Sequence, residues 1–276
     1  MKIRIITAIC MAIVLIPVAI FSHTVVYPIT MALLSVVGAF EMLRCIGLHK
    51  TYIASVPCIV LAGVLPFAAY FASDAFDTAL ISVTAILLFW LFAVSLFSHG
   101  THPVGEAAMA FFGLIYVIWG FGMMTALRQI AHGAYLYLLP FLGAWMSDSF
   151  AYFTGRLFGR HKLIPDVSPK KTVEGAVGGV VFAMASFALY GFVVSQITGA
   201  APHYMALVLL GLPVSLVSII GDLIMSLIKR RYEIKDYGRL FPGHGGVLDR
   251  FDSVLATAIA LYLLCTYTTF FRLVFQ

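Results

Sequence analysis

Charged residues are scarce in this sequence, and their scarcity excludes several classes of protein. Of the 276 residues, 62% are hydrophobic and 11% are charged, whereas a soluble domain has about 25% charged residues. So few polar residues cannot cover a single water-soluble core of this length, which excludes a soluble globular enzyme. A disordered chain is also excluded, because it needs low hydrophobicity, and so is a nucleic-acid-binding protein, despite a pI near 9.0. We therefore expect an integral membrane protein whose apolar surface faces lipid.

Several motifs are missing as well. The four cysteines lie in apolar segments without Cys-x-x-Cys spacing, which favours small buried side chains over disulfides or a thiolate metal site. Neither a Walker GxxxxGK(S/T) motif nor a kinase glycine-rich loop is present, which excludes a P-loop nucleotide-binding fold. No ten-residue segments alternate between polar and apolar residues, so a transmembrane β-barrel is not expected.

Long apolar runs, in contrast, are abundant. A run of about 17–25 apolar residues is long enough to cross a bilayer as a helix, and we count about nine. No small-x-small cleavage site follows the first run, so we expect a retained helix rather than a signal peptide. The sequence thus predicts an all-α, polytopic membrane protein with about nine transmembrane helices. The expected spans are residues 5–21, 25–43, 53–71, 78–97, 107–127, 134–153, 175–195, 204–228 and 253–271.

The basic residues predict the orientation of these spans. With nine spans, 15 of the 17 Lys and Arg residues fall on the side of the N-terminus, and only Arg128 and Arg272 fall on the other. Since Lys and Arg accumulate on the cytoplasmic side, we expect a cytoplasmic N-terminus in the cytoplasmic (inner) membrane. The net charge of +5 is therefore interpreted as a topology signal and not as a sign of a nucleic-acid partner.

The two halves of the chain differ in their loops. Residues 1–133 contain short plain loops, and we interpret them as a scaffold that can also form a dimer interface. Both long basic loops lie in residues 134–276. Long polar loops beside intramembrane charges are typical of functional sites, so the catalytic site is expected in this second half.

Two aspartates lie inside predicted spans, Asp148 and Asp222. A charged residue at the centre of a bilayer costs at least about 2.5–3.5 kcal/mol, so it usually faces a bundle interior or an aqueous cavity. Each aspartate lies seven positions before a cytoplasmic loop, which places both about 10 Å deep. The matching depths predict one water-filled pocket open to the cytoplasm. The alternative is that each carboxyl group is protonated or hydrogen-bonded between packed helices.

Polar side chains follow Asp222 at helical spacing. Ser226, Lys229, Arg230 and Glu233 lie four, seven, eight and eleven residues later, so they share one helix face with the aspartate. The stripe leads from a buried acid through a hydroxyl to a cationic rim. The alternative for the lysine and arginine is a membrane helix end whose basic side chains extend to the interface.

A glycine-rich loop precedes the last span. Three glycines, including Gly245 and Gly246, flank His244 and allow main-chain N–H groups to approach an anion closely. Asp249 and Asp252 follow on one helix face. Simpler interpretations exist, because acids are favourable at any helix N-terminus, the glycines can form a plain turn, and a lone histidine is more often structural than a ligand.

The other basic loop contains a predicted helix start. Ser168 and Pro169 suit an N-cap and the first helical position. The free N–H groups of that helix, with Lys171 and Thr172 beside them, would form a phosphate site. The alternative is that the basic residues of this loop bind anionic lipid headgroups.

These residue types indicate a chemistry. Carboxylate oxygens without thiolates or paired imidazoles suit Mg²⁺, and Mg²⁺ surrounded by Lys and Arg is typical of phosphoryl or nucleotidyl transfer. A pocket open to both the cytoplasm and the lipid would bring a nucleoside triphosphate together with a lipid phosphate. The expected metal ligands are Asp148, Asp222, Asp249 and Asp252.

Residues 226–252 resemble the signature of the CDP-diacylglycerol synthases, also called phosphatidate cytidylyltransferases. The resemblance extends to Gly221-Asp222, to Asp148-x-x-Ala-Tyr and to residues 168–175, and it covers about residues 145–253. It implies the reaction of CTP with phosphatidate to give CDP-diacylglycerol and pyrophosphate, dependent on Mg²⁺. It also implies a helical polytopic homodimer in membrane lipid, and it leaves open whether a second cation such as K⁺ assists.

The resemblance implies roles for individual residues. Asp222 and Asp249 would carry the Mg²⁺, and Asp148 and Asp252 would either bind it as well or hold its waters or a second cation. Basic side chains would offset the repulsion between the two anionic substrates, and Ser226 and the loop glycines would orient phosphate oxygens. The expected catalytic and substrate-binding residues, besides the four aspartates, are Ser168, Lys171, Thr172, Glu174, Ser226, Lys229, Arg230, Lys235, Asp236, His244, Gly245, Gly246 and Arg250.

Two other functions share part of this residue pattern. A CTP-dependent polyprenol or phytol kinase would transfer the γ-phosphoryl group to an alcohol and release CDP, whereas the synthase releases pyrophosphate. A secondary transporter also contains intramembrane acids, but it should show inverted repeats in both halves. In this sequence the polar residues gather in one half and on one side, which favours the enzyme.

Overall fold

The computed structural model describes residues 2–98, 100–101, 103–272 and 274–275, without the side chains of residues 2–6 and 8. It confirms the all-α class. The chain forms two compact units: unit 1 comprises Met1–Gln129 and Arg231–Phe251, and unit 2 comprises Ile130–Arg230 and Asp252–Gln276. The first boundary lies four residues before the end of the predicted N-terminal half. The glycine-rich loop, however, belongs to the same unit as the N-terminal helices.

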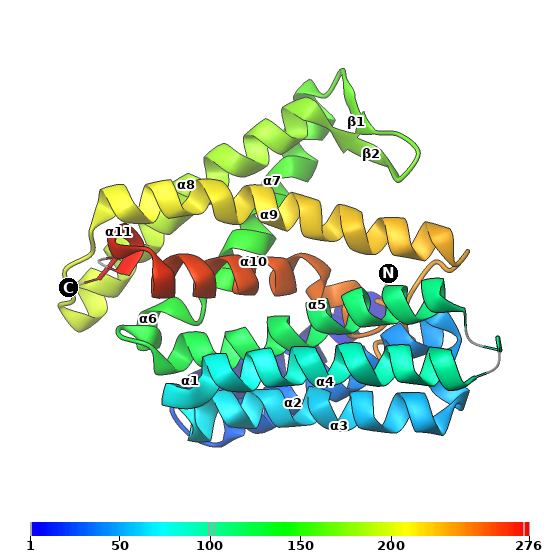
Figure 1. Cartoon of the computed structure of the whole chain (residues 1–276). Coiled ribbons are helices and arrows are strands. Elements are labelled where there is room, and N and C mark those ends of the chain that lie inside the picture. Colours follow the sequence, from blue (N-terminus) through cyan, green and yellow to red (C-terminus); the bar gives the residue numbers. More distant parts are fainter. Residues whose placement is uncertain (1, 99, 102, 273, 276) are drawn as a thin grey trace. The chain divides into compact units, whose positions relative to one another are not determined.

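Unit 1 is a bundle of long helices. In it α2 packs against α1, α3 and α5, and α4 packs against α3 and α5 (Figure 1). Glycines allow this close packing, since Met42 fills the space beside Gly113 and Leu65 fills the space beside Gly122. The elements are α1 (Lys2–Ile20), α2 (Val26–Ile46), η1 (Leu48–Lys50), α3 (Tyr52–Phe71), η2 (Ser73–Ala75), α4 (Phe76–Phe97), α5 (Val104–Gln129) and the first turn of α10 (Leu248–Tyr267).

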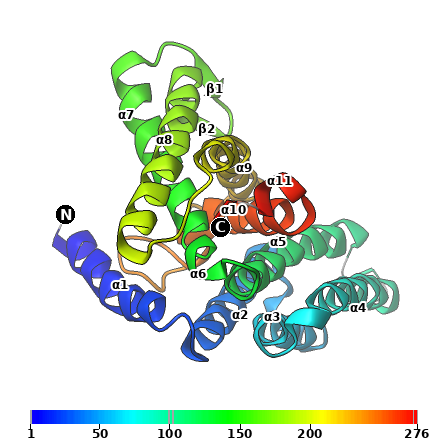
Figure 2. The ribbon, with the colours of Figure 1, turned by 90° about the vertical axis from the view of Figure 1, so that its left-hand side faces the viewer.

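Unit 2 contains the remaining helices and a hairpin. Figure 2 shows α7 and α8 lying against each other, and glycines again permit the approach, because a Cβ at Gly175 would meet the Ala151 carbonyl oxygen at 2.6 Å. The elements are α6 (Gly133–Leu136), α7 (Leu139–Phe158), β1 (Lys162–Ile164), β2 (Ser168–Thr172), α8 (Val173–Thr198), α9 (Tyr204–Arg231), the rest of α10 and α11 (Thr269–Arg272).

The β1–β2 hairpin was not predicted, and it corrects the expected start of α8. Ser168 is not an N-cap, because residues 168–172 form an antiparallel strand in which Ser168 pairs with Ile164. The helix begins at Val173 instead, and the hydroxyl of Thr172 accepts the N–H of Gly175 at 3.1 Å. Thr172 is thus the N-cap, a position at which threonine is favoured.

The expected span at residues 134–153 is also divided differently. A short helix, α6, ends at Leu136, and α7 then runs from Leu139 to Phe158. Pro140 lies in the first turn of α7, where its missing N–H leaves no hydrogen bond unmade. The predicted run therefore began too early, because apolar character alone does not mark a helix start.

Among the described residues, six helices are long and apolar enough to cross a membrane, namely α2, α3, α4, α5, α8 and α9. The protein is therefore a multi-pass membrane protein. The other predicted spans fall on α1, on α6 with α7, and on α10. The total of nine spans and the cytoplasmic N-terminus stay predictions. The side chains of Lys2 and Arg4, which contribute to the predicted orientation, lie outside the described residues.

Candidate active site

Unit 2 brings three of the predicted aspartates into one cluster. Lys171 on β2 forms an ion pair with Asp222 on α9, and Ser253 on α10 donates to Asp148 on α7 at 3.2 Å. Lys171 and Asp222 are also the charged neighbours of Asp148. Asp252 on α10 has both other aspartates as charged neighbours. We call these five residues, from four separate elements, the carboxylate cluster.

Buried hydroxyls hold the helices that carry the cluster. Ser147 on α7 and Ser215 on α9 share a hydrogen bond of 2.8 Å, and both are fully buried. The hydroxyl of Thr257 on α10 donates to the Pro140 carbonyl of α7 at 2.9 Å. Because buried polar groups are costly unless paired, these bonds favour one arrangement of α7, α9 and α10.

The two intramembrane aspartates keep matching positions along their helices. Asp148 lies ten residues before the end of α7, and Asp222 lies nine residues before the end of α9. The predicted stripe beyond Asp222 is correct as far as Arg230, and Lys229 is a charged neighbour of Asp252. Glu233 is not part of the stripe, because α9 ends at Arg231 and Glu233 has a φ of 54°.

The donor set of the cluster suits a hard cation. Within the part of the chain that the structure describes, no three His, Cys, Asp or Glu side chains come close enough together to hold a metal ion. Mg²⁺, however, is usually bound through one or two carboxylates together with water and substrate phosphates. The carboxylates of Asp222 and its neighbours Asp148 and Asp252 meet that requirement by their chemistry.

Unit 1 holds the fourth aspartate in a different role. Oδ2 of Asp249 accepts the main-chain N–H groups of Tyr237 at 2.7 Å, Gly246 at 2.9 Å and Gly238 at 3.4 Å. Asp249 is buried. Its carboxylate therefore joins the two ends of the loop at residues 237–246, which we call the glycine loop. The Gly246 amide, predicted to orient a phosphate, is donated to Asp249 instead.

The glycine loop closes on itself through main-chain bonds. The N–H of Phe241 donates to Gly245 and the N–H of His244 donates to Phe241, both at 2.9 Å. Gly245 has a φ of 86°, a conformation that residues with a side chain rarely adopt. The Arg250 side chain donates to the His244 carbonyl at 2.7 Å. This hydrogen bond holds the Arg250 side chain against the turn and stabilises the conformation of the turn.

A polar cavity of about 670 Å³ opens beside this loop, and we call it the loop cavity. Lys235, Arg239 and Arg250 line it together with His244, and Asp236 supplies one acidic group. Three permanent cations and one carboxylate make the lining net positive. Such a cavity suits an anion, and five of the residues that were predicted to bind substrate line it, namely Lys235, Asp236, His244, Gly245 and Arg250.

Two residues of α2 that the sequence analysis missed hold the loop from outside. The carboxylate of Glu41 accepts the N–H groups of Val247 at 3.1 Å and Leu248 at 2.9 Å. Arg44 donates to the Tyr237 carbonyl. Glu41 is a third carboxylate inside a predicted apolar span, as Asp148 and Asp222 are, so the same signal could have revealed it.

The remaining predicted residues lie around the hairpin of unit 2. Glu174 accepts the N–H groups of Arg160 and His161 and contacts the His161 ring nitrogen Nδ1 at 2.6 Å. Glu174 and the N-cap Thr172 therefore fix the two ends of the hairpin. Lys171 directly precedes Thr172 on β2, and it is the residue of the hairpin that pairs with Asp222 of the carboxylate cluster.

Known proteins resemble this chain over most of its length. A model of the cytidylyltransferase family matches residues 2–268. The phosphatidate cytidylyltransferase of Bacillus subtilis is 32% identical over 272 residues, which are 96% of this chain and 97% of the relative. That of Staphylococcus saprophyticus is 34% identical over 92% of this chain and 95% of its own length. That of Brucella abortus is 48% identical over 123 residues, 45% of this chain and 44% of its own.

The chain belongs to the cytidylyltransferase family. It is therefore a nucleotidyltransferase, and the resemblance described from the sequence is confirmed. The match begins at residue 2, so the family relationship includes the N-terminal helices, for which the sequence had offered only matching hydropathy.

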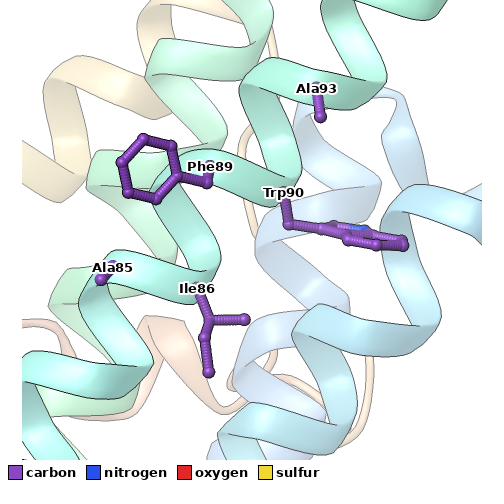
Figure 3. A pocket seen from close by; sticks show the side chains of 5 residues that line it. All are labelled: Ala85, Ile86, Phe89, Trp90 and Ala93. Carbon is purple, nitrogen blue, oxygen red and sulfur yellow. The ribbon is translucent and has the colours of Figure 1, made fainter.

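Unit 1 also has an apolar hollow on α4 (Figure 3). Ala85, Ile86, Phe89 and Trp90 line it with Ala93, and the Trp90 indole N–H donates to the Ile53 carbonyl at 2.9 Å. None of these side chains titrates or coordinates a metal ion. The hollow therefore offers no group for nucleotidyl transfer.

Proposed function

We propose that this nucleotidyltransferase is a phosphatidate cytidylyltransferase, which converts CTP and phosphatidate into CDP-diacylglycerol and pyrophosphate. The observation that carries the proposal is the gathering of Asp148, Asp222 and Asp252 with the cations of Lys171 and Lys229 within a multi-pass membrane protein. The names of the full-length relatives from Bacillus and Staphylococcus support it. A lipid substrate also explains why so apolar a protein carries this chemistry.

The reaction needs no covalent intermediate. A phosphate oxygen of phosphatidate attacks the α-phosphorus of CTP, the new P–O bond forms, and the bond to the β-phosphate oxygen breaks as pyrophosphate leaves. Catalysis then consists mainly of positioning and of neutralising negative charge. Lys171 and Lys229 are the cations beside the carboxylate cluster, and we assign them to charge neutralisation.

We propose that Asp222, with Asp148 and Asp252 beside it, holds Mg²⁺. When bound, the ion would neutralise phosphate charge and orient the triphosphate. Asp249 was also expected to bind the metal, but its Oδ2 atom accepts three main-chain N–H groups. We therefore assign Asp249 to the conformation of the glycine loop. A second cation such as K⁺ stays a prediction.

We propose that the loop cavity binds the phosphates of CTP. Its basic side chains are Lys235, Arg239 and Arg250. At the N-terminus of α10, the N–H groups of Val247, just before the helix, and of Leu248, its first residue, donate to Glu41. We therefore expect the basic side chains of the loop cavity, and not the N-terminus of α10, to bind the phosphates.

The test is an assay with radiolabelled CTP, phosphatidate micelles and Mg²⁺, in which the lipid product and the released pyrophosphate are identified. We expect Asp222→Asn to reduce turnover by at least about 100-fold, because it removes charge where the metal and the phosphates would meet. Asp74→Asn is the matched control, since Asp74 lies in η2 and is exposed. Near-normal turnover by Asp222→Asn would contradict the assignment.

The same assay separates the other functions. Release of CDP and a phosphorylated alcohol would indicate a polyprenol or phytol kinase. Flux of a solute across liposomes without CTP turnover would indicate a transporter. A cytoplasmic N-terminus, an active site facing the cytoplasm and a homodimer belong to the same proposal. Labelling of single cysteines introduced into the loops, in intact cells, would test the orientation, and mass measurement in detergent would test the homodimer.

A further inference from the structure

Glu41 is a buried carboxylate in an apolar helix, and the charges proposed for catalysis do not explain it. Its residue is 3% exposed, and its two oxygens accept the N–H groups of Val247 and Leu248, one oxygen to each. These residues are more than 200 positions away in the sequence. A charged group in an apolar span is costly even when it is hydrogen-bonded. Helix packing alone would be served better by an apolar side chain, so the carboxylate indicates a further role.

The glycines of the loop leave room for this carboxylate. A Cβ atom at Gly238 or at Gly246 would overlap the Glu41 carboxylate. Both glycines are buried. The carboxylate therefore lies directly against the main chain at both ends of the glycine loop, and glycine is the only residue that fits there.

Arg44 extends the contact by one helical turn. It lies three residues after Glu41 on α2 and donates to the Tyr237 carbonyl. The N–H of Tyr237 is donated to Asp249 at the same time. Both main-chain groups of Tyr237 are thus held by side chains, one from α2 and one from α10.

We propose that Glu41 and Arg44 are positioning residues for the transfer reaction, which fix the glycine loop so that the basic side chains of the loop cavity meet the phosphates of CTP. The inference rests on the proposed function. Neither residue lines the loop cavity, so each acts through the loop. Through them, helix α2 of the N-terminal half contributes to substrate binding, a role that the sequence had assigned to the second half.

The experiment measures kcat and KM for CTP with the purified full-length enzyme. Glu41→Gln keeps the size of the side chain but loses one acceptor oxygen. We expect it to raise KM for CTP about 10- to 100-fold, because displacement of binding groups by about 1 Å has effects of this size. Glu41→Asp should not rescue the enzyme, since its carboxylate is one methylene short. A purely structural role would lower the folded fraction, and hence the apparent kcat, at an unchanged KM.

Arg44→Gln is the second variant, and it keeps the inference falsifiable if Glu41→Gln does not fold. Arg44 is exposed, so the variant should fold, and we expect a rise in KM for CTP of about tenfold from the lost hydrogen bond. Ser35→Ala is the matched control on α2. Ser35 is fully buried, and its hydroxyl has no hydrogen-bond partner among the described residues, so KM should not change.

The outcomes separate this inference from the proposed function. If the wild-type enzyme does not convert CTP and phosphatidate, the proposed function is wrong. If the wild-type enzyme is active and the folded variants at Glu41 and Arg44 keep the wild-type KM for CTP, the positioning role is wrong. A raised KM in both variants, with a wild-type KM in Ser35→Ala, supports it.

Discussion

Lys171 is the counter-charge that Asp222 and Asp148 share, and its replacement tests whether the carboxylate cluster exists as described. Lys171→Met keeps most of the side-chain volume but removes the ammonium group that pairs with Asp222. Asp148 loses a favourable charged neighbour as well. The three carboxylates then lose this cation, and Lys229 is a charged neighbour of Asp252. We expect the variant to fold with lower stability.

The size of the effect follows from the burial of the pair. Two unit charges about 4 Å apart interact by about 4 kcal/mol at an effective dielectric constant of about 20. The side chains of Lys171 and Asp222 are each 23% exposed, so water screens part of this interaction. We therefore expect a coupling free energy of about 1–3 kcal/mol between the two residues, above the value of about 0–1 kcal/mol for surface pairs.

A double-mutant cycle measures this coupling. The unfolding free energies of wild type, Lys171→Met, Asp222→Asn and the double variant are compared in detergent micelles titrated with sodium dodecyl sulfate. The double variant should be less destabilised than the sum of the two single variants, because each single variant leaves one charge without its partner. Lys170→Met is the control, since Lys170 is the exposed neighbour on the same strand.

The reasoning fails if the coupling is below about 0.5 kcal/mol, since distant residues couple by no more than about that amount. It also fails if Lys170→Met destabilises the protein as much as Lys171→Met, because the effect would then come from the hairpin rather than from the ion pair.

Two further substitutions test the local structure around the site. Thr172→Val should lower the unfolding free energy by about 1 kcal/mol, because the N-cap bond to Gly175 is lost. Thr172→Ser keeps the hydroxyl and should keep the wild-type stability. Equal melting temperatures of the two variants would contradict the capping role. Gly246→Ala should abolish most CTP turnover, because the new Cβ would overlap the Glu41 carboxylate. Gly105→Ala, with open space around it, should keep wild-type turnover, and turnover by Gly246→Ala within about twofold of this control would refute the overlap.

The sequence alone predicted much of the carboxylate cluster. Asp148 and Asp222 were identifiable because each interrupts an apolar run, and such a carboxylate is too costly in lipid to be there without a partner. Asp252 and Lys171 were identified by their loops. Their matching depths predicted a shared site for Asp148 and Asp222. That Lys171 joins them could not be derived from the sequence, because the three residues are contributed by α7, β2 and α9, and no local pattern specifies how such elements pack.

Other sequence predictions were wrong for local reasons. Ser168-Pro169 has the composition of a helix start, but the hairpin pairing of Ser168 with Ile164 gives these residues extended conformations. The helix begins where Thr172 can accept the Gly175 amide instead. Capping preferences identify suitable residues, and competing main-chain pairing decides which one is used.

Hydrophobicity and charge distribution by themselves determined that this chain is a helical, multi-pass membrane protein, because transfer of apolar side chains into lipid depends on composition and run length and not on neighbours. The signature around residues 226–252 determined the family. Only the tertiary structure decided that Glu41 and Arg44 of α2 hold the glycine loop. A hydrogen bond acts over about 3 Å, and residues some 200 positions apart reach that distance only after the helices have packed.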